Sequence, residues 1–446
     1  MKAREIILLI FIILGGFLLT QSDKGRIDWN WGWDWEDGEG LFFARSHEFT
    51  AQETKTIEAP LPEELVIDNS HGDVEVQPSA DGSLTVSLQT KAYRRSEEEA
   101  REAAQAVHLT VDRQGAKLVL STNRDTFRTK RFQTNWLIRL PEGRAIDIRN
   151  SYGQVKTERT GGTSITNSHG PVASRDVRGT FVCQTSYDDV TLSDLAADCR
   201  VECQHGSVRA ARVKGRVEVT SSYGEVRVED AGADVVINGV HAEIAVLKVG
   251  GTVKAETTYR DISLAETGPA TVIGHHSDVD AQGINGDLDV ADIYGRVSVR
   301  GVRGSLSVHG RSLEIKGRTI SGPKLSLSTS YQNVDLADFS GQTDITTAHG
   351  SVSLQPSRIG GDIIVQAEHS EIRLAWPSGA VLPLEARTRN GSIHWGLQGK
   401  PDLEKTNGES LLRAFGQAAG GPRVNLNTSY ADIILEPAAA AETDKD

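Results

Sequence analysis

The sequence predicts an all-β protein, a single-stranded β-solenoid (β-helix) in which coils of about 18 residues stack on one another. A short motif recurs through most of the 446 residues, and such self-similarity is the signature of a stacked repeat. Within each copy, apolar and polar residues alternate with the period of a β-strand. A turn that often contains one of the chain's 44 glycines separates two such runs.

Residues 217–230 show the repeat most clearly. They read VEVTSSYGEVRVED, in which valines occupy every second position on both sides of Tyr223 and Gly224. Period-two alternation places the valines on one face of a strand, where they can be buried together. Glycine at the turn permits a positive φ angle without a clash from Cβ. The motif therefore predicts a strand, a tight turn and a second strand.

The position of Tyr223 is aromatic in nine successive copies, which are 17 or 18 residues apart and alternate between tyrosine and histidine. These repeat-defining residues are Tyr152, His169, Tyr187, His205, Tyr223, His241, Tyr259, His276 and Tyr294. An early copy and looser later ones occur at His71, Ser312, Tyr331, His349, His369, Asn390 and Tyr430.

Two coil lengths are compatible with this alternation. A coil of about 18 residues stacks each tyrosine on a histidine, whereas one of about 36 residues separates them into two faces and brings histidines close enough to share a metal. The alternation fails after Tyr294, where His349 is followed by His369. This loss of phase favours the shorter coil. The aromatic residues are then expected to stack along one corner, where they have a structural role.

Residues 1–22 are expected to form a signal anchor or transmembrane segment. Lys2 and Arg4 precede an apolar run over residues 6–19, which is the order found in export signals. Retention and cleavage both remain open, because the run is short for a spanning helix and no A-x-A site follows. We expect a single-pass protein of the cell membrane whose C-terminal bulk lies outside the cytoplasm, in the periplasm or beyond the cell.

Residues 23–50 are expected to be a juxtamembrane linker. They are polar and contain Trp29, Trp31, Trp33 and Trp35 at every second position. Tryptophan is enriched at membrane surfaces, so an aromatic belt is the first interpretation. A stacking platform for sugar rings and an edge strand are the alternatives.

Residues 51–140 are expected to form an N-terminal cap region with strands and one helix. The helix spans 96–107, with Ser96 as its N-cap and acidic residues in its first turn. A hairpin over 109–120 and a strand over 136–140 follow. A solenoid needs such cover because its terminal coil otherwise offers an unpaired edge.

Residues 141–436 are the predicted solenoid repeats. An insertion over 397–422 interrupts them and is expected to contain a short helix at 409–415. A last coil over 424–436 restores the pattern, and residues 437–446 read as a disordered tail.

Small or amide-bearing residues such as Asn150 and Asn167 stand two positions before the aromatic one, which predicts hydrogen bonds from coil to coil. The three cysteines, Cys183, Cys199 and Cys203, stand at positions that the alternation assigns to the inward face of the strands. They are expected to be small core residues, with a Cys199–Cys203 or Cys183–Cys203 disulfide left open.

Acidic residues stand two positions after the aromatic one in consecutive copies, at Glu225, Glu243, Asp261 and Asp278. Carboxylates stacked about 5 Å apart repel one another or need a cation. Calcium is the plausible hard cation, and these four residues are the candidate ligands. The Gly-Gly-x-Gly-x-Asp pattern of calcium β-rolls is absent from the sequence, and nearby basic residues favour an ordinary solvated edge.

The sequence contains no catalytic or cofactor-binding motif that we can identify. G-x-S-x-G, H-E-x-x-H and phosphate-loop patterns are absent, so no catalytic residue, cofactor or required metal is assigned. The net charge of −13 argues against nucleic-acid partners, because phosphates need basic patches. Paired carboxylates on the flank of the β-helix leave a polysaccharide-cleaving enzyme as a remote alternative.

The layout resembles the bacterial β-strand-repeat family of candidate adhesins, whose function is unknown. The similarity lies in Leu140-Pro141-Glu142-Gly143, in the following AIDIRNSYGQVKTE, and in the recurring N-S-H/Y-G-x-V motif that begins at Asn69, Asn150 and Asn167. It covers roughly residues 60–436. The resemblance implies an exported β-solenoid and supplies neither an activity nor binding residues.

We therefore expect a non-enzymatic, adhesin-like or scaffold protein of the bacterial envelope that binds a polymer, such as a cell-wall glycan, or a protein. An envelope-stress sensor acting through a membrane partner is the alternative. With four residues before Glu5, the chain shows no cytoplasmic output domain of its own. A carbohydrate-active β-helix enzyme is the second alternative.

Overall fold

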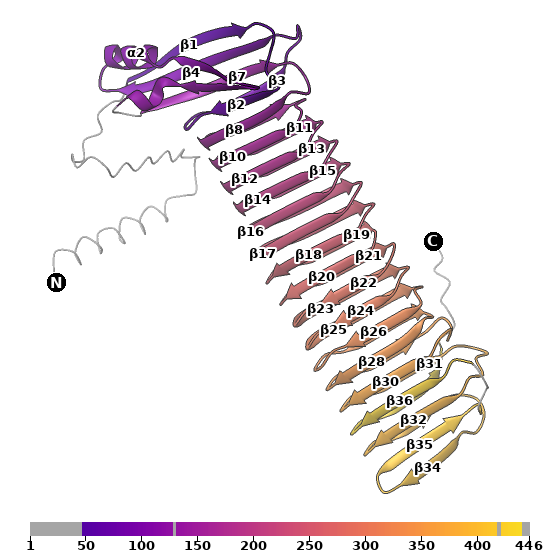
Figure 1. Ribbon diagram of the computed structural model, residues 1–446. Coiled ribbons are helices and arrows are strands. Elements are labelled where there is room, and N and C mark those ends of the chain that lie inside the picture. The colour runs from indigo at the N-terminus through magenta and orange to yellow at the C-terminus, as the bar shows by residue number, and fades with distance from the viewer. Residues whose placement is uncertain (1–46, 128–130, 417–420, 439–446) are drawn as a thin grey trace, which may run out of the picture. The chain divides into compact units, whose positions relative to one another are not determined.

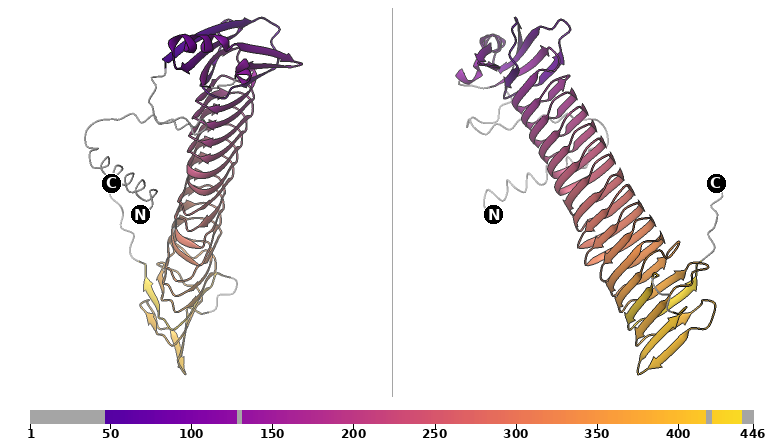
Figure 2. Two further views of the ribbon diagram at one scale, coloured as in Figure 1. Left: turned by 90° about the vertical axis from the view of Figure 1, so that its left-hand side faces the viewer. Right: turned by 45° about the vertical axis from the view of Figure 1, so that its right-hand side comes forward.

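The computed structural model describes residues 47–127, 131–416 and 421–438 of the chain. These residues belong to one compact unit, Ser46–Asp446. Figure 1 shows strands stacked side by side along this unit, and the two views of Figure 2 show the same arrangement from other directions. The segments expected as a signal anchor, over 1–22, and as most of the tryptophan-rich linker lie outside the described residues. Within the part described, no helix has the length and apolar character needed to cross a membrane.

Most coils contribute two strands that meet at the corner carrying the repeat-defining residue. The first strands of the coils are β8 (Ala145–Tyr152), β10 (Thr163–His169), β12 (Phe181–Tyr187), β14 (Cys199–His205), β18 (Val253–Thr258), β20 (Ala270–His275), β22 (Leu288–Ala291), β24 (Leu306–His309), β26 (Lys324–Ser328), β28 (Gln342–Ala348) and β30 (Ile363–Glu368). The second strands are β9 (Val155–Glu158), β11 (Val172–Val177), β13 (Val190–Leu195), β15 (Val208–Val213), β19 (Ile262–Thr267), β21 (Val279–Ile284), β23 (Tyr294–Val302), β25 (Ser312–Ile320), β27 (Val334–Phe339), β29 (Val352–Gln355) and β31 (Ile372–Trp376). Strands β16 (Val217–Ala231) and β17 (Val235–Val249) run through the corner and supply both.

The backbone register confirms a coil of 18 residues in the regular part of the stack. Strands β16 and β17 pair in parallel with Val217 opposite Val235 and Tyr223 opposite His241. Each residue therefore lies opposite the equivalent residue of the next coil. Residues at the same position of successive repeats form a column along the stack. The alternative coil of about 36 residues is wrong, because tyrosine and histidine lie opposite each other in adjacent coils and do not form two separate faces.

The core lies between the two strands of each coil. Val217, Val219, Val226 and Val228 are all fully buried, whereas Thr220 between them faces solvent. Because the columns repeat this pattern, apolar contacts run continuously from coil to coil. Burial of a valine-sized side chain stabilises the fold by about 1.5–3 kcal/mol, so hydrophobic stacking is the main stabilising contribution.

Residues 47–140 contain the first coil of the stack and the strands and helix that cover it, so part of the range expected as a cap belongs to the solenoid. These elements are β1 (His47–Ile57), β2 (Glu64–Asp68), β3 (Val74–Pro78), β4 (Leu84–Arg94), α2 (Glu97–Ala106), β5 (Leu109–Gln114), β6 (Lys117–Thr122), the short 3-10 helix η1 (Asn123–Thr126) and β7 (Phe132–Leu140). Strands β2 and β3 form the first coil and pair with β8 and β9 on one side and with β6 and β7 on the other. Antiparallel strands β5 and β4 then pair with β6 and β7, so the parallel stack does not end on bare edges.

Helix α2 begins where the sequence predicts. The Ser96 hydroxyl accepts a hydrogen bond from the backbone N–H of Glu99 at 3.2 Å, which satisfies one free donor of the first turn. Ala100 and Ala104 face inward, and Ala104 packs with Ala92 and Phe132 of strands β4 and β7. Strand β1 begins at His47, so part of the range expected to be linker is strand.

The end of the stack differs from the sequence prediction in two ways. The remaining strands are β32 (Leu384–Arg389), β33 (Ile393–Trp395), β34 (Asp402–Thr406), β35 (Glu409–Ala414), β36 (Val424–Ser429) and β37 (Ile433–Pro437). The short helix expected at 409–415 is wrong: β35 is a strand, antiparallel to β32 and to β34. The last coil in sequence, β36 and β37, is not last in space, because it pairs with β30 and β31 on one side and with β32 and β33 on the other.

The C-terminal boundary also departs from the expected tail. Pro437 belongs to β37, and the backbone N–H of Ala438 bonds to the carbonyl of Trp376 at 2.9 Å. The rest of the segment expected as a tail, over 439–446, lies outside the described residues.

Candidate binding ridge

The repeat-defining residues form a stack of rings that we call the aromatic ladder. Ten rings follow one another without interruption, with centroids of neighbouring rings 4.6 to 5.6 Å apart. They belong to His71, Tyr152, His169, Tyr187, His205, Tyr223, His241, Tyr259, His276 and Tyr294. The rings lie at the separation of stacked aromatic pairs, which add about 0.5–1.5 kcal/mol each beyond area burial.

A second segment of the ladder follows a one-coil interruption at Ser312. It comprises Tyr331, His349, His369 and Tyr430, with centroid separations of 4.7 to 5.0 Å. Tyr430 stacks on His369 because β36 lies against β30. Asn390 lies at the corner between β32 and β33, in the coil beyond.

The ladder is a solvent-facing ridge and not part of the core. Its tyrosines are 41% to 61% exposed, although ring faces lie against neighbouring rings. These tyrosines are Tyr152, Tyr187, Tyr223, Tyr259, Tyr294, Tyr331 and Tyr430. Because stacking covers the faces of these rings, the ridge presents ring edges and phenol hydroxyls to solvent.

The buried column behind the ladder fixes its backbone. The side-chain amide of Asn150 donates to the carbonyls of Gly72 at 3.2 Å and Gly153 at 3.3 Å, and that of Asn167 donates to Gly153 at 3.0 Å. Further along, the Thr257 hydroxyl donates to the carbonyl of Ala242 at 2.6 Å. The predicted coil-to-coil hydrogen bonds therefore exist, and most run from a side chain to a corner carbonyl. They satisfy backbone acceptors that would otherwise be buried without partners.

The acidic column stands beside the ladder, with Glu225 directly opposite Glu243. Two of its members bind groups of the protein: Arg209 donates to the Glu225 carboxylate at 3.1 Å, and the Asp278 carboxylate accepts the backbone N–H of Arg296 at 2.9 Å. Register places Asp261 and Asp278 in the same column. No group of three or more His, Cys, Asp or Glu side chains within 47–127, 131–416 and 421–438 is arranged to hold a metal ion. The structure thus stacks the four calcium candidates without gathering them into a site.

Carboxylates of this kind recur at the opposite corner. Asp234 accepts the backbone N–H and the hydroxyl of Thr252, at 2.8 and 2.9 Å. The backbone hydrogen bond from Thr252 is the main reason why the pKa of Asp234 is lowered. Acidic residues at both corners therefore stabilise the next coil by accepting its backbone donors.

The three cysteines are free thiols in the core, as the sequence predicts, and no disulfide joins them. Burial raises the pKa of Cys199 to about 12 and that of Cys203 to about 11. The pKa of Cys183 is also raised by burial. Thiols with such pKa values carry almost no thiolate at neutral pH and are poor nucleophiles.

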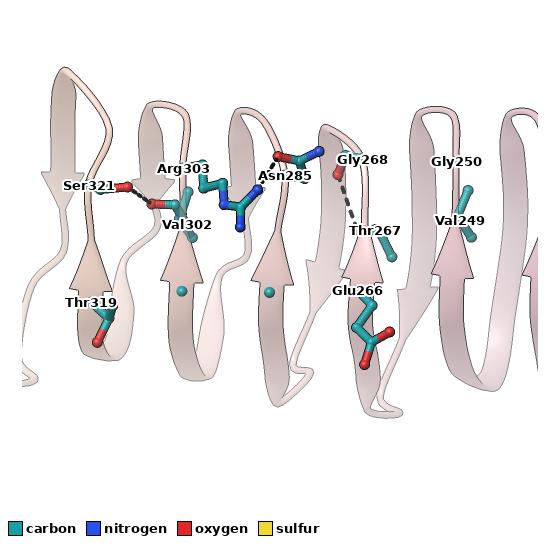
Figure 3. Close-up of a pocket in the computed structure, with 12 residues that line it drawn as sticks. Val249, Gly250, Glu266, Thr267, Gly268, Asn285, Val302, Arg303, Thr319 and Ser321 are labelled. Atoms are coloured by element: carbon teal, nitrogen blue, oxygen red, sulfur yellow. Dashed lines mark hydrogen bonds between the residues drawn. The ribbon is translucent and has the colours of Figure 1, made fainter.

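An open groove of about 600 Å³ lies at the other corner of the coils, over the ends of β19, β21, β23 and β25. At this corner most coils carry a residue in the left-handed conformation, and in two successive coils it is a glycine, Gly283 and Gly301. Figure 3 shows the groove, where Arg303 donates to the Asn285 side chain at 3.2 Å. Missing side chains at Gly283 and Gly301 account for the hollow.

Asp292 is a buried carboxylate that the sequence analysis did not single out. It stands in the small, amide-bearing column but is a buried carboxylate, 3% exposed, behind Tyr294. It accepts backbone N–H groups from His276 at 3.0 Å, Ser277 at 3.1 Å, Ile293 at 2.6 Å and Tyr294 at 3.3 Å. Burial raises the pKa of Asp292, and these four donors oppose that rise. The only sequence signal is an acid in a column of asparagine, threonine and serine.

Comparison with known proteins identifies the type of repeat. The model of the family described as Toastrack DUF4097 matches residues 62–267 and 243–436. No curated protein matches the chain. A solved structure of a candidate cell adhesion protein from Clostridium sporogenes ATCC 15579 is 9% identical and covers 87% of this chain and 100% of its own, with a TM-score of 0.20. A candidate adhesin from Bacteroides fragilis NCTC 9343 is 14% identical over 62% of this chain and 96% of its own, with a TM-score of 0.24.

Proposed function

We propose, from the premise that this chain belongs to the Toastrack DUF4097 family, that it acts without catalysis as an exported scaffold whose aromatic ladder binds an extended partner. The partner is a polymer such as a cell-wall glycan, or a protein of the envelope. The family match carries no activity, so the proposal rests on the surface of the molecule.

The exposed aromatic ladder is the observation that carries the proposal. Large exposed aromatic residues on a soluble surface are usually scattered singly, and contiguous ones mark interaction sites. Here Tyr152, Tyr187, Tyr223 and Tyr259 are 45% to 61% exposed and belong to one uninterrupted stack. Tyrosine combines a large apolar body with a polar tip, which suits it to binding surfaces.

The geometry of the ladder favours an extended partner over a compact ligand. Successive rings follow the inter-strand spacing of roughly 4.8 Å, and their edges carry hydroxyl and imidazole groups at that repeat. A chain with polar groups at a similar spacing can hydrogen-bond to many rings at once. Multiple weak contacts along one partner then add to a useful affinity.

Attachment to the membrane belongs to the proposal and draws on the sequence. Lys2 and Arg4 before the apolar run over 6–19 support export, with the repeats outside the cytoplasm. A polysaccharide-cleaving role has no comparable support, since Glu225 and Asp278 are engaged with Arg209 and with Arg296. No contact among the described residues favours a regulatory role.

Co-sedimentation with purified cell-wall sacculi and a glycan panel tests the proposal, using the compact unit from Ser46 onward, with and without calcium. A variant carrying Tyr187→Ala and Tyr223→Ala removes two rings of the ladder. The matched control carries Thr191→Ala and Arg227→Ala, on outward positions of the second strands. We expect retention of the parent and the control and loss of retention by the ladder variant.

The other outcomes are equally informative. Equal retention of all three proteins would place binding on another face and contradict the role of the ladder. No retention of the parent would exclude these polymers, and crosslinking from Tyr223 in intact envelopes would then look for a protein partner. Loss of retention on calcium removal would assign a role to the acidic column.

A further inference from the structure

One rung of the aromatic ladder is missing between two tyrosines. Tyr294 lies opposite Ser312 in the pairing of β23 with β25, and the backbone bond from Ser330 to Arg311 at 2.7 Å places Tyr331 one coil further on. The two tyrosines are thus two coils apart, roughly 9.6 Å by the inter-strand spacing. Among the described residues no ring contact joins them, and both are well exposed.

The same chain shows what fits between two tyrosines at this separation. Four histidines lie between tyrosines of the preceding and following coils. They are His169, His205, His241 and His276, with ring centroids 4.6 to 5.6 Å from their tyrosine neighbours. In coil order the alternation continues through Tyr294, Ser312, Tyr331 and His349, so Ser312 occupies a histidine position.

Hydrogen bonds on both sides of this gap hold the backbone at the spacing of the stack. Behind Ser312, the hydroxyl of Thr329 accepts the N–H of Leu313 at 2.9 Å and donates to its carbonyl at 2.8 Å. On the other side, the buried Asp292 accepts the N–H of Tyr294. Both corners therefore keep the spacing set by the parallel pairing.

We propose that the gap at Ser312 is a binding slot for a planar nitrogen heterocycle of imidazole size, sandwiched between the rings of Tyr294 and Tyr331. Aromatic rings at this separation prefer offset stacking, and imidazole rings of the ladder already stack in this way between tyrosines. The slot also leaves the ring edge open to solvent, as it is for the histidines of the ladder. This site needs only two rings and stands independently of polymer binding along the whole ridge.

The charges around the slot favour the neutral form of the ligand. Arg311 precedes Ser312 and is exposed, whereas Arg296 is paired with Glu314 at 2.9 Å. A protonated ring bound beside Ser312 would be repelled by the positive charge of the neighbouring Arg311. The ligand chemistry can come from a free small molecule or from a histidine side chain of a partner protein.

Saturation-transfer NMR on the full-length protein tests the slot, at about pH 8.5 where imidazole is neutral. The probes are imidazole and the tripeptide Gly-His-Gly, with phenol and glucose as comparisons. In Ser312→His the protein supplies its own ring, and we expect transfer to imidazole to fall at least about fivefold. In Tyr331→Ala one wall is removed, and we expect a similar loss.

A variant that should regain binding distinguishes a filled slot from a misfolded protein. Ser312→His combined with His205→Ser moves the gap to the position between Tyr187 and Tyr223, and binding should return there. Thermal unfolding of each variant verifies that the coils are intact. Tighter binding of the tripeptide would identify a partner's histidine as the source, and equal binding a free heterocycle. Absence of binding, binding unaffected by Ser312→His, or equal binding of phenol and glucose would overturn the proposal.

Discussion

The ring of Tyr430 stacks on the ring of His369 with centroids 4.7 Å apart, although a complete coil and a hairpin lie between them in the sequence. The contact exists because β36 and β37 enter the stack between two coils that precede them in the chain. Arg423 marks the point of insertion, where its backbone N–H bonds to the Asp362 carboxylate at 2.8 Å. The C-terminal coil is thus held by parallel pairing on both sides.

We expect truncation after Gly416 to destabilise everything beyond β31. The truncation removes Val424, Leu426, Ile433 and Leu435, which are at most 1% exposed, and together their burial is worth at least about 6 kcal/mol. It also leaves β30 and β32 with unpaired edges. Hydrogen exchange should then become fast over residues 384–414, while the first coils stay protected. A chain ending at Ala438 is the control, and protection unchanged by the truncation would contradict the inserted coil.

We expect Asp292→Asn to lower the free energy of unfolding by about 1–3 kcal/mol. The carboxylate accepts four backbone N–H groups through both of its oxygens, and an asparagine amide turns one oxygen into a donor facing another donor. Urea denaturation measures the change. Asp289→Asn, at an exposed position of β22, is the matched control and should leave stability unchanged. Equal effects of the two substitutions would show that the buried hydrogen bonds contribute little.

His71 gives the stack a pH dependence at its first ring. Burial lowers the pKa of His71 below its ordinary value of 6.5, and the positive charge of Arg124 lowers it further. The unfolded chain therefore takes up this proton more readily than the folded one, so stability falls as the pH drops through about 6.5. Urea midpoints at about pH 7.5 and pH 5.5 measure the fall. In His71→Gln part of the fall should disappear, and an identical fall in both proteins would refute this role.

The buried cysteines should differ in their tolerance of serine. Cys203 stands in the column of small polar residues, its Sγ lies 3.7 Å from the carbonyl of Gly206, and Ser221 bonds to the corner carbonyl of Tyr223 in the next coil. Cys203→Ser should therefore change stability by less than about 1 kcal/mol. Cys183 is 1% exposed and packs among apolar side chains, so Cys183→Ser buries a hydroxyl and should cost about 1–3 kcal/mol. Thermal unfolding compares the two, and the reverse order would contradict the assignment of the columns.

Much of the candidate ridge could be predicted from the sequence. The nine repeat-defining residues from Tyr152 to Tyr294 stack as the coil length requires, because a fixed interval in sequence becomes a fixed column in a parallel stack. The gap at Ser312 was visible only as an irregular copy. Its meaning depends on knowing that Tyr331 follows it in space and that no ring closes the space between.

The sequence by itself determined the coil and the column, and the tertiary structure decided how the stack ends. Alternation within 18 residues is local information, so the buried faces, the ladder and helix α2 with its Ser96 cap can be read directly from neighbouring residues. A short helix was expected over 409–415, yet the open edge of β32 supplies hydrogen-bond partners and Glu409–Ala414 forms strand β35. In the same way, the place of β36 between β30 and β32 depends on edges that lie far from it in the sequence. Strand edges that are distant in the sequence decide where a strand pairs, and a local sequence pattern contains no information about them.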